Sequence, residues 1–104
     1  MLFGKKLREL REGKKLVLRK VAAQLDIDTA TMSKIERGDR HAKKEHLAIL
    51  SKILGVPEVE LKTLWLADKV CELVEEEDEA MDALKVAETQ IENGISENSK
   101  SIKV

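Results

Sequence analysis

One short segment, TATMSK, combines hydroxyl groups, methyl groups and a single lysine within six residues. Lys34 can donate to the O6 and N7 atoms of guanine, and Thr29 and Ser33 can form hydrogen bonds with several base edges. Ala30, or the methyl group of Thr31, can pack against the methyl group of thymine. The segment therefore offers the chemistry that reads bases in a major groove. Its contacts are few per chain, so specificity needs a second half-site or help from DNA shape.

The overall charge of the chain hides a strong asymmetry. Residues 1–56 carry 14 Lys or Arg and 7 Asp or Glu, whereas residues 57–104 carry 5 and 13. The formal net charges are therefore +7 and −8, which leave −1 for the whole chain. A basic front half suits contact with phosphates, and the acidic rear half must then face elsewhere. Ordinary solvated surface charge is the alternative explanation.

Other kinds of chemistry find little support in the residues. His41 and His46 are five positions apart, which is the wrong spacing for two metal ligands on one helical face. Cys71 has no histidine partner in a recognisable motif and lies in an apolar register, which favours a buried core position over a nucleophile. No glycine-rich phosphate loop or acid–base pair is evident. We therefore expect neither enzymatic activity nor a cofactor, a metal or a small-molecule substrate.

The elements that must position the TATMSK segment are short helices. Apolar residues recur at helical spacing over residues 2–14 and again over residues 18–25. Between the second helix and Thr29, Ile27 is expected to plug a tight turn, Asp28 to cap the next helix, and Asp26 to take a left-handed or bridge conformation. The third helix runs from Thr29 to Arg37 and ends at Gly38. Two short helices joined by a tight turn predict a helix-turn-helix.

Three more helices are expected in the remainder of the chain. The fourth covers residues 44–54 and ends at Gly55, and Pro57 suits the first turn of the fifth. Apolar periodicity then continues to the acidic run of residues 75–79, which could open a sixth helix. Asn93 and Gly94 are expected to end this helix, and residues 95–104 have the composition of a frayed tail.

Length and composition fit a single all-α domain with an appendage. The chain has 104 residues, of which 42% are hydrophobic and 38% charged. No apolar run approaches the roughly 20 residues that cross a bilayer, and the first residues lack a signal-peptide core, so a cytoplasmic location is expected. The expected division is a helix-turn-helix domain at 1–66, a helical extension at 67–93 and a flexible tail at 94–104.

The order of these segments resembles a known family, the phage-repressor-like or Xre/Cro-type helix-turn-helix regulators. The resemblance runs from about Phe3 to Leu64. It rests on LRELRE in the first helix, LRKVAAQLDID through the turn, and above all TATMSKIERGDR. It implies a compact five-helix repressor-like DNA-binding domain that carries a C-terminal helical extension.

The resemblance also implies roles for individual residues. Thr29, Ala30 and Lys34 lie where family members contact base edges, with Asp28, Thr31 and Ser33 beside them. Arg11 and Glu36 match positions that form a structural ion pair. The positions that hold phosphates in the family correspond to Arg19, Arg37, Arg40, Lys43 and Lys44.

Two residues depart from the family pattern. Leu18 stands where many members place a glutamine that reaches a phosphate, so that contact is expected to be missing. Asp26 stands where glycine is usual in the turn.

The residues from Trp65 onward exceed what a DNA-binding domain of this kind needs. Their broad apolar face has little core left to cover it, which predicts a homodimer that places two recognition helices on successive major grooves. The sixth helix folding back on its own domain is the alternative. The interface residues expected are Trp65, Val70, Val74, Met81, Leu84 and Ile91.

The sequence allows three functions for the segment from Trp65 onward. Its layout resembles the helical extension of some small regulators encoded beside restriction-modification genes. An antitoxin-type regulator would use the same segment to bind a protein toxin. An adaptor without DNA affinity would keep the fold and bind only protein, and it would show no salt-dependent DNA binding.

Overall fold

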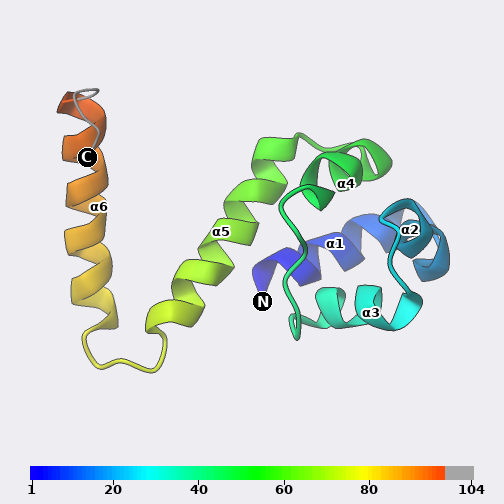
Figure 1. Ribbon diagram of the computed structural model, residues 1–104, viewed down its shortest axis with the longest axis horizontal. Coiled ribbons are helices and arrows are strands. Elements are labelled where there is room, and N and C mark those ends of the chain that lie inside the picture. The colour runs from blue at the N-terminus through cyan, green and yellow to red at the C-terminus, as the bar shows by residue number, and fades with distance from the viewer. Residues whose placement is uncertain (98–104) are drawn as a thin grey trace. The chain divides into compact units, whose positions relative to one another are not determined.

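The computed structural model describes residues 1–97 of the chain and the side chains of residues 1–94, and this part contains helices, turns and loops but no strand (Figure 1). The all-α prediction is therefore confirmed. No helix in this part is long and apolar enough to span a membrane. The helices are α1 (Leu2–Gly13), α2 (Leu18–Gln24), α3 (Thr29–Arg37), α4 (His46–Leu54), α5 (Glu58–Val74) and α6 (Ala80–Glu97).

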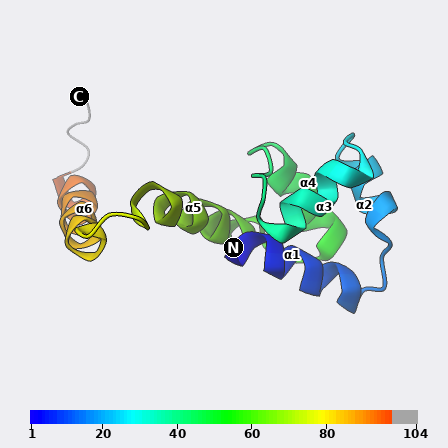
Figure 2. The ribbon, with the colours of Figure 1, turned by 90° about the horizontal axis from the view of Figure 1, so that it is seen from below.

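The chain divides into two compact units, one from Met1 to Val70 and one that begins at Cys71. The first unit contains α1 to α4 and most of α5, and α3 packs against both α1 and α2 (Figures 1 and 2). One hydrophobic core holds these helices together. The core consists of Phe3, Leu7, Val21, Ala22, Leu25, Met32, Ile35, Ala42, Leu47, Leu50, Leu54, Leu61 and Trp65.

A glycine lets α1 and α3 cross closely. Gly4 is buried, and a Cβ atom built on it would collide with the backbone carbonyl oxygens of Ile35 and Glu36. Phe3 and Leu7 flank this crossing and are both almost fully buried. The first helix therefore supports the back of α3, which leaves the opposite face of α3 open to solvent.

The turn between α2 and α3 has the conformation that the sequence predicts. Asp26 has a φ of 58°, in the left-handed region, and Ile27 is half-buried against the core. Asp28 has an extended backbone and its side chain accepts a hydrogen bond from the N–H of Thr31, so it is the N-cap of α3. Gly38 ends the helix with a φ of 83°, which a residue without a Cβ adopts at no steric cost.

The core extends further along α5 than the sequence indicates. Trp65 is only 6% exposed, and its indole Nε1 donates a hydrogen bond to the carbonyl oxygen of Ala42 at 2.8 Å. Its ring therefore lies in the core of the first unit. This corrects the sequence analysis, which placed Trp65 in an exposed dimer interface. The opposite correction applies to Cys71, which we expected to be buried and which is exposed. Helical periodicity identifies a face but not which face the rest of the domain covers.

The second unit differs from expectation at the end of its helix. The acidic run of residues 75–79 forms a turn between α5 and α6, and α6 continues through Gly94 to Glu97. The predicted end at Asn93 and Gly94 is wrong, because a glycine costs a helix interior only about 1 kcal/mol relative to alanine. Of the tail predicted at 94–104, residues 98–104 lie outside the described residues.

Candidate nucleic-acid interface

The outer face of α3 carries the side chains that the sequence assigns to base contact. Thr29, Ala30 and Lys34 are exposed, and Thr31 and Ser33 are half-buried. Met32 and Ile35 lie on the inner face and are buried in the core. The small side chains on the outer face allow a groove wall to approach the helix closely, with Lys34 as the longest donor among them.

The cap of α3 fixes a carboxylate at the start of this face. Asp28 Oδ1 accepts a hydrogen bond from the N–H of Thr31 at 2.7 Å. Hydrogen bonding to Thr31 lowers the pKa of Asp28, and the nearby charges of Lys34 and Arg40 lower it further. Asp28 is thus ionised near neutral pH. Because Asp28 Oδ1 already accepts this hydrogen bond, the side chain serves mainly to stabilise the first turn of α3.

The end of α3 carries an arginine that is held in a defined position. Arg37 Nη1 donates a hydrogen bond to Ser33 Oγ at 2.7 Å, and Arg37 Nε donates to Asp39 Oδ2 at 3.1 Å. All three side chains lie at the surface, since Arg37 and Asp39 are exposed and Ser33 is half-buried. The guanidinium of Arg37 therefore folds back over α3.

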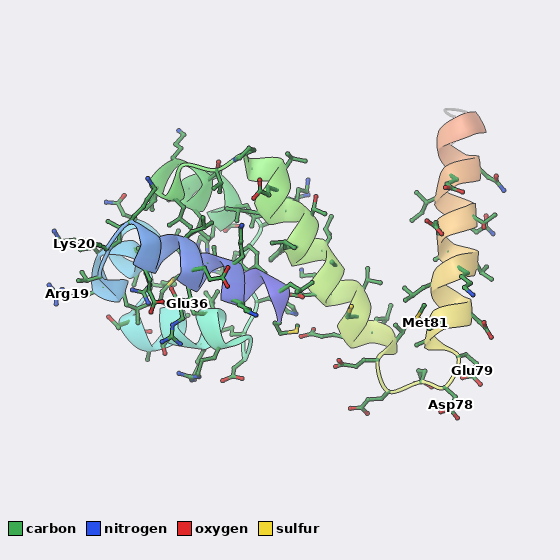
Figure 3. All side chains as sticks on the ribbon, turned by 180° about the vertical axis from the view of Figure 1, so that it is seen from behind. Arg19, Lys20, Glu36, Asp78, Glu79 and Met81 are labelled. Carbon is green, nitrogen blue, oxygen red and sulfur yellow. The ribbon has the colours of Figure 1, made fainter. Side chains whose placement is uncertain are left out.

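Exposed cations lie on the elements that come before and after α3 in the sequence. Arg19 and Lys20 extend from α2 (Figure 3), and Arg40, Lys43 and Lys44 are exposed on the loop before α4. A hollow of about 200 Å³ opens beside the start of α3, where it brings Arg40 and Lys43 near Asp28. The residues that line the hollow are Ile27, Asp28, Thr31, Ile35, Arg40, His41, Lys43 and His46. The fold thus places exposed positive charge on α2 and on the loop that follows α3, the two segments next to the helix that carries the polar face.

An ion pair sets the position of α3 against α1. Arg11 Nε and Nη2 donate to the two carboxylate oxygens of Glu36 at 2.7 and 3.1 Å, and Arg11 Nη1 donates to the carbonyl oxygen of Leu16 at 2.9 Å. Their side chains are only 13% and 6% exposed, respectively, and the hydrogen bond to Glu36 raises the pKa of Arg11. Figure 3 shows Glu36 between α3 and α1. This pair joins α1, the following loop and α3.

Comparison with known proteins agrees with this geometry. The model of a helix-turn-helix domain family matches residues 2–64, more than half of the chain. The chain belongs to this helix-turn-helix domain family. Its helix-turn-helix consists of α2, the turn at Asp26 to Asp28, and α3, and the other helices of the first unit support it.

One curated relative is similar over part of the chain. It is an HTH-type transcriptional regulator of Bacillus subtilis (strain 168), RghRB, which is described as uncharacterized. The two sequences are 40% identical over 65 residues, which make up 62% of this chain and 45% of the relative. This chain therefore aligns with less than half of that protein. No solved structure gives a significant match to the chain.

Two carboxylates of the first unit have roles that the sequence did not predict. Asp39 holds Arg37, and Asp68 accepts hydrogen bonds from the backbone N–H groups of Leu2 and Phe3 at 3.0 and 2.9 Å. Asp68 carried a usable signal, because it follows Leu61 and Trp65 at helical spacing on the core side of α5 and a carboxylate there needs donors. Nothing in the sequence distinguishes Asp39 from an ordinary loop residue.

Proposed function

We propose that this protein is a sequence-specific, double-stranded-DNA-binding transcriptional regulator of the Xre/Cro type. The observation that carries the proposal is the outer face of α3, where Thr29, Ala30 and Lys34 are exposed on a helix that is capped at both ends. The second helix of a helix-turn-helix enters the major groove with its N-terminal residues on base edges. Lys34 then donates to a guanine, and the threonines and Ala30 contact neighbouring bases.

The surrounding cations supply affinity in this proposal. Arg19, Arg40, Lys43 and Lys44 neutralise backbone phosphates on both sides of the groove, and the counterions they release make binding strongly salt-dependent. Leu18 is half-buried against the core, so α2 begins without the glutamine contact that the family resemblance would supply. Affinity therefore depends on the loop before α4 more than on the start of α2.

Selection of bound DNA from a random pool tests the proposal. The expected product is an enriched sequence, and Lys34→Ala should relax one or two of its positions by about 1–3 kcal/mol. Arg40→Ala should instead weaken binding to all sequences alike and reduce the salt slope by about one. Lys85→Ala, which removes an exposed lysine of α6, is the matched control and should change neither. Failure of the wild-type chain to enrich any sequence at low salt would reject the proposal and favour the adaptor.

We further propose that the protein acts as a homodimer on an inverted repeat. In support, the rear helices carry large apolar side chains in solvent: Val70 is 44% exposed, Met81 64% and Ile91 62%. Val70 also lies at spacings of four and three residues from Leu66 and Leu73, two further exposed leucines of α5. Such a stripe suits pairing between helices. Val74 and Leu84 are half-buried and belong to the same proposed interface.

Light scattering over a concentration series tests the dimer. The wild-type chain should have the mass of two copies at micromolar concentration, and Ile91→Glu should shift the equilibrium toward the monomer because it buries a charge. Thr89→Glu, on another face of α6, is the control. A second outcome would favour an antitoxin-type regulator: a monomer whose Ile91 face is covered only when a protein partner is present. Selected DNA with two half-sites about one helical turn apart would support dimeric reading.

Control of restriction-modification genes is the narrowest form of the proposal. Its support is the resemblance of the segment after Trp65 to the helical extension of such regulators. The selected DNA sequence should then occur upstream of a restriction or methylation gene and of the regulator's own gene. Its occurrence only beside unrelated genes would reject this role and leave the DNA-binding proposal intact.

A further inference from the structure

The side chains of Ser33, Arg37 and Asp39 form a connected group that the proposed function leaves without a specific role. Arg37 was assigned to phosphate on the basis of family resemblance, as the last residue of α3. An arginine that binds only phosphate needs an extended side chain and no further hydrogen-bond partners. Here two bonds hold the guanidinium, one at 2.7 Å to Ser33 Oγ and one at 3.1 Å to Asp39 Oδ2.

The bond to Ser33 brings Arg37 toward the base-reading part of α3. Ser33 lies four residues before Arg37, one turn closer to the N-terminus of the helix, and side chains in a helix lean toward that end. Ser33 is adjacent to Lys34 on the face that the proposed function places in the major groove. The hydrogen bond therefore keeps the guanidinium beside the other base-reading groups.

The donors that remain on Arg37 suit a base edge. A guanidinium has five N–H groups, and the two bonds use one on Nε and one on Nη1. The three others are sufficient for the paired acceptors O6 and N7 of guanine. Ser33 accepts from Arg37 and keeps its own O–H as a donor. The negative charge of Asp39 offsets the positive charge of Arg37. Arg37 is therefore attracted less strongly to backbone phosphates in general.

We infer that Arg37 reads a guanine and that Asp39 is the positioning residue that gives Arg37 this specificity. The inference rests on the proposed function and assigns one further base contact within the same site. Arg37 acts by contact with the base. Asp39 acts through Arg37, by fixing the Nε of its guanidinium while Ser33 holds Nη1, and by repelling phosphate from the same place.

Binding of the full-length chain to its selected DNA, to variants of that DNA and to unrelated duplex tests the inference. Arg37→Ala should remove the preference for guanine at one position. Asp39→Ala should lower the preference at that same position about tenfold, and it should leave binding to unrelated duplex equal or tighter. Asp39→Asn, which keeps an acceptor for Arg37 Nε, should retain more of the preference. In the Arg37→Ala background, Asp39→Ala should cause no further loss.

Glu45→Ala is the matched control, because it removes an exposed carboxylate from the same loop without touching Arg37. It should leave the base preference unchanged, and circular dichroism should show the same unfolding midpoint for the Asp39 variants as for wild type. Uniform weakening of all sequences by Arg37→Ala, or an unchanged preference in Asp39→Ala, would overturn the inference while leaving the proposed function standing. A wild-type chain that selects no DNA would instead reject the proposed function itself.

Discussion

Asp68 Oδ2 accepts a hydrogen bond from the backbone N–H of Phe3 at 2.9 Å, which joins α5 to the first turn of α1 across 65 positions of the sequence. The other oxygen of Asp68 accepts from the N–H of Leu2 at 3.0 Å. Met1 provides no side-chain cap for α1, so the carboxylate of a distant helix occupies the positive end of the helix dipole. The bonds fix α1 and α5 together at one end of the core that supports α3.

Replacement of Asp68 should therefore destabilise the first unit. Asp68→Ala leaves the N–H of Phe3 buried without a partner and removes a helix cap, for an expected loss of about 1–3 kcal/mol in the free energy of unfolding. Asp68→Asn should lose less, since its amide oxygen still accepts one bond. Urea denaturation measures the loss. Glu76→Ala, in the exposed turn before α6, should change stability by no more than about 0.5 kcal/mol.

Removal of one partner of the largely buried Arg11–Glu36 ion pair should cost far more stability than removal of one partner of the exposed Arg8–Glu12 pair. Glu36→Leu leaves the largely buried guanidinium of Arg11 without its carboxylate, for an expected loss of about 3 kcal/mol. The double variant Arg11→Met with Glu36→Leu should recover much of it. Arg8→Ala breaks the exposed pair with Glu12 and should cost less than about 1 kcal/mol. Equal losses in urea denaturation for Glu36→Leu and Arg8→Ala would contradict this prediction.

The cap of α3 should make stability depend on pH in the acid range. The pKa of Asp28 lies below its ordinary value of 3.8 because the carboxylate accepts hydrogen bonds from Thr31. The contribution of the ionised cap is therefore complete above the unfolded value and is lost as the pH falls through the lower, folded pKa. Asp28→Asn keeps a good N-cap that does not titrate. Its stability should fall less steeply than that of wild type below about pH 4, as measured by thermal unfolding.

Two glycines of α1 should respond in opposite directions to the same substitution. At Gly4 a Cβ would collide with backbone carbonyl oxygens of α3, so Gly4→Ala should force α1 and α3 apart and cost about 1–3 kcal/mol or more. At Gly13 nothing lies within 4 Å of a Cβ, and the backbone is helical. Gly13→Ala should therefore stabilise the protein by about 0.4–1 kcal/mol. Thermal unfolding of the two variants distinguishes a packing requirement from general helix propensity.

The sequence by itself determined the helices of the first unit and most of their ends, because the forces that set them act over a few residues. The start of α4, however, lies two residues later than predicted. Apolar spacing placed the helices, the short side chain of Asp28 marked the cap, and Gly38 and Gly55 marked left-handed ends. The tolerance of aspartate for a positive φ accounted for Asp26. The outer face of α3 followed directly, because Met32 and Ile35 fix which side of a nine-residue helix is buried.

Only the tertiary structure decided which surfaces are covered and which distant groups meet. Periodicity marked Trp65 and Cys71 as equally apolar, yet one is in the core and the other in solvent, because the domain covers a single side of α5. Asp68 reaches α1, and Asp39 holds Arg37, through arrangements that no local pattern encodes. The segment that could read DNA is thus visible in the sequence. The positioning of its arginine is visible only in the fold, because a hydrogen bond depends on where two side chains lie in space.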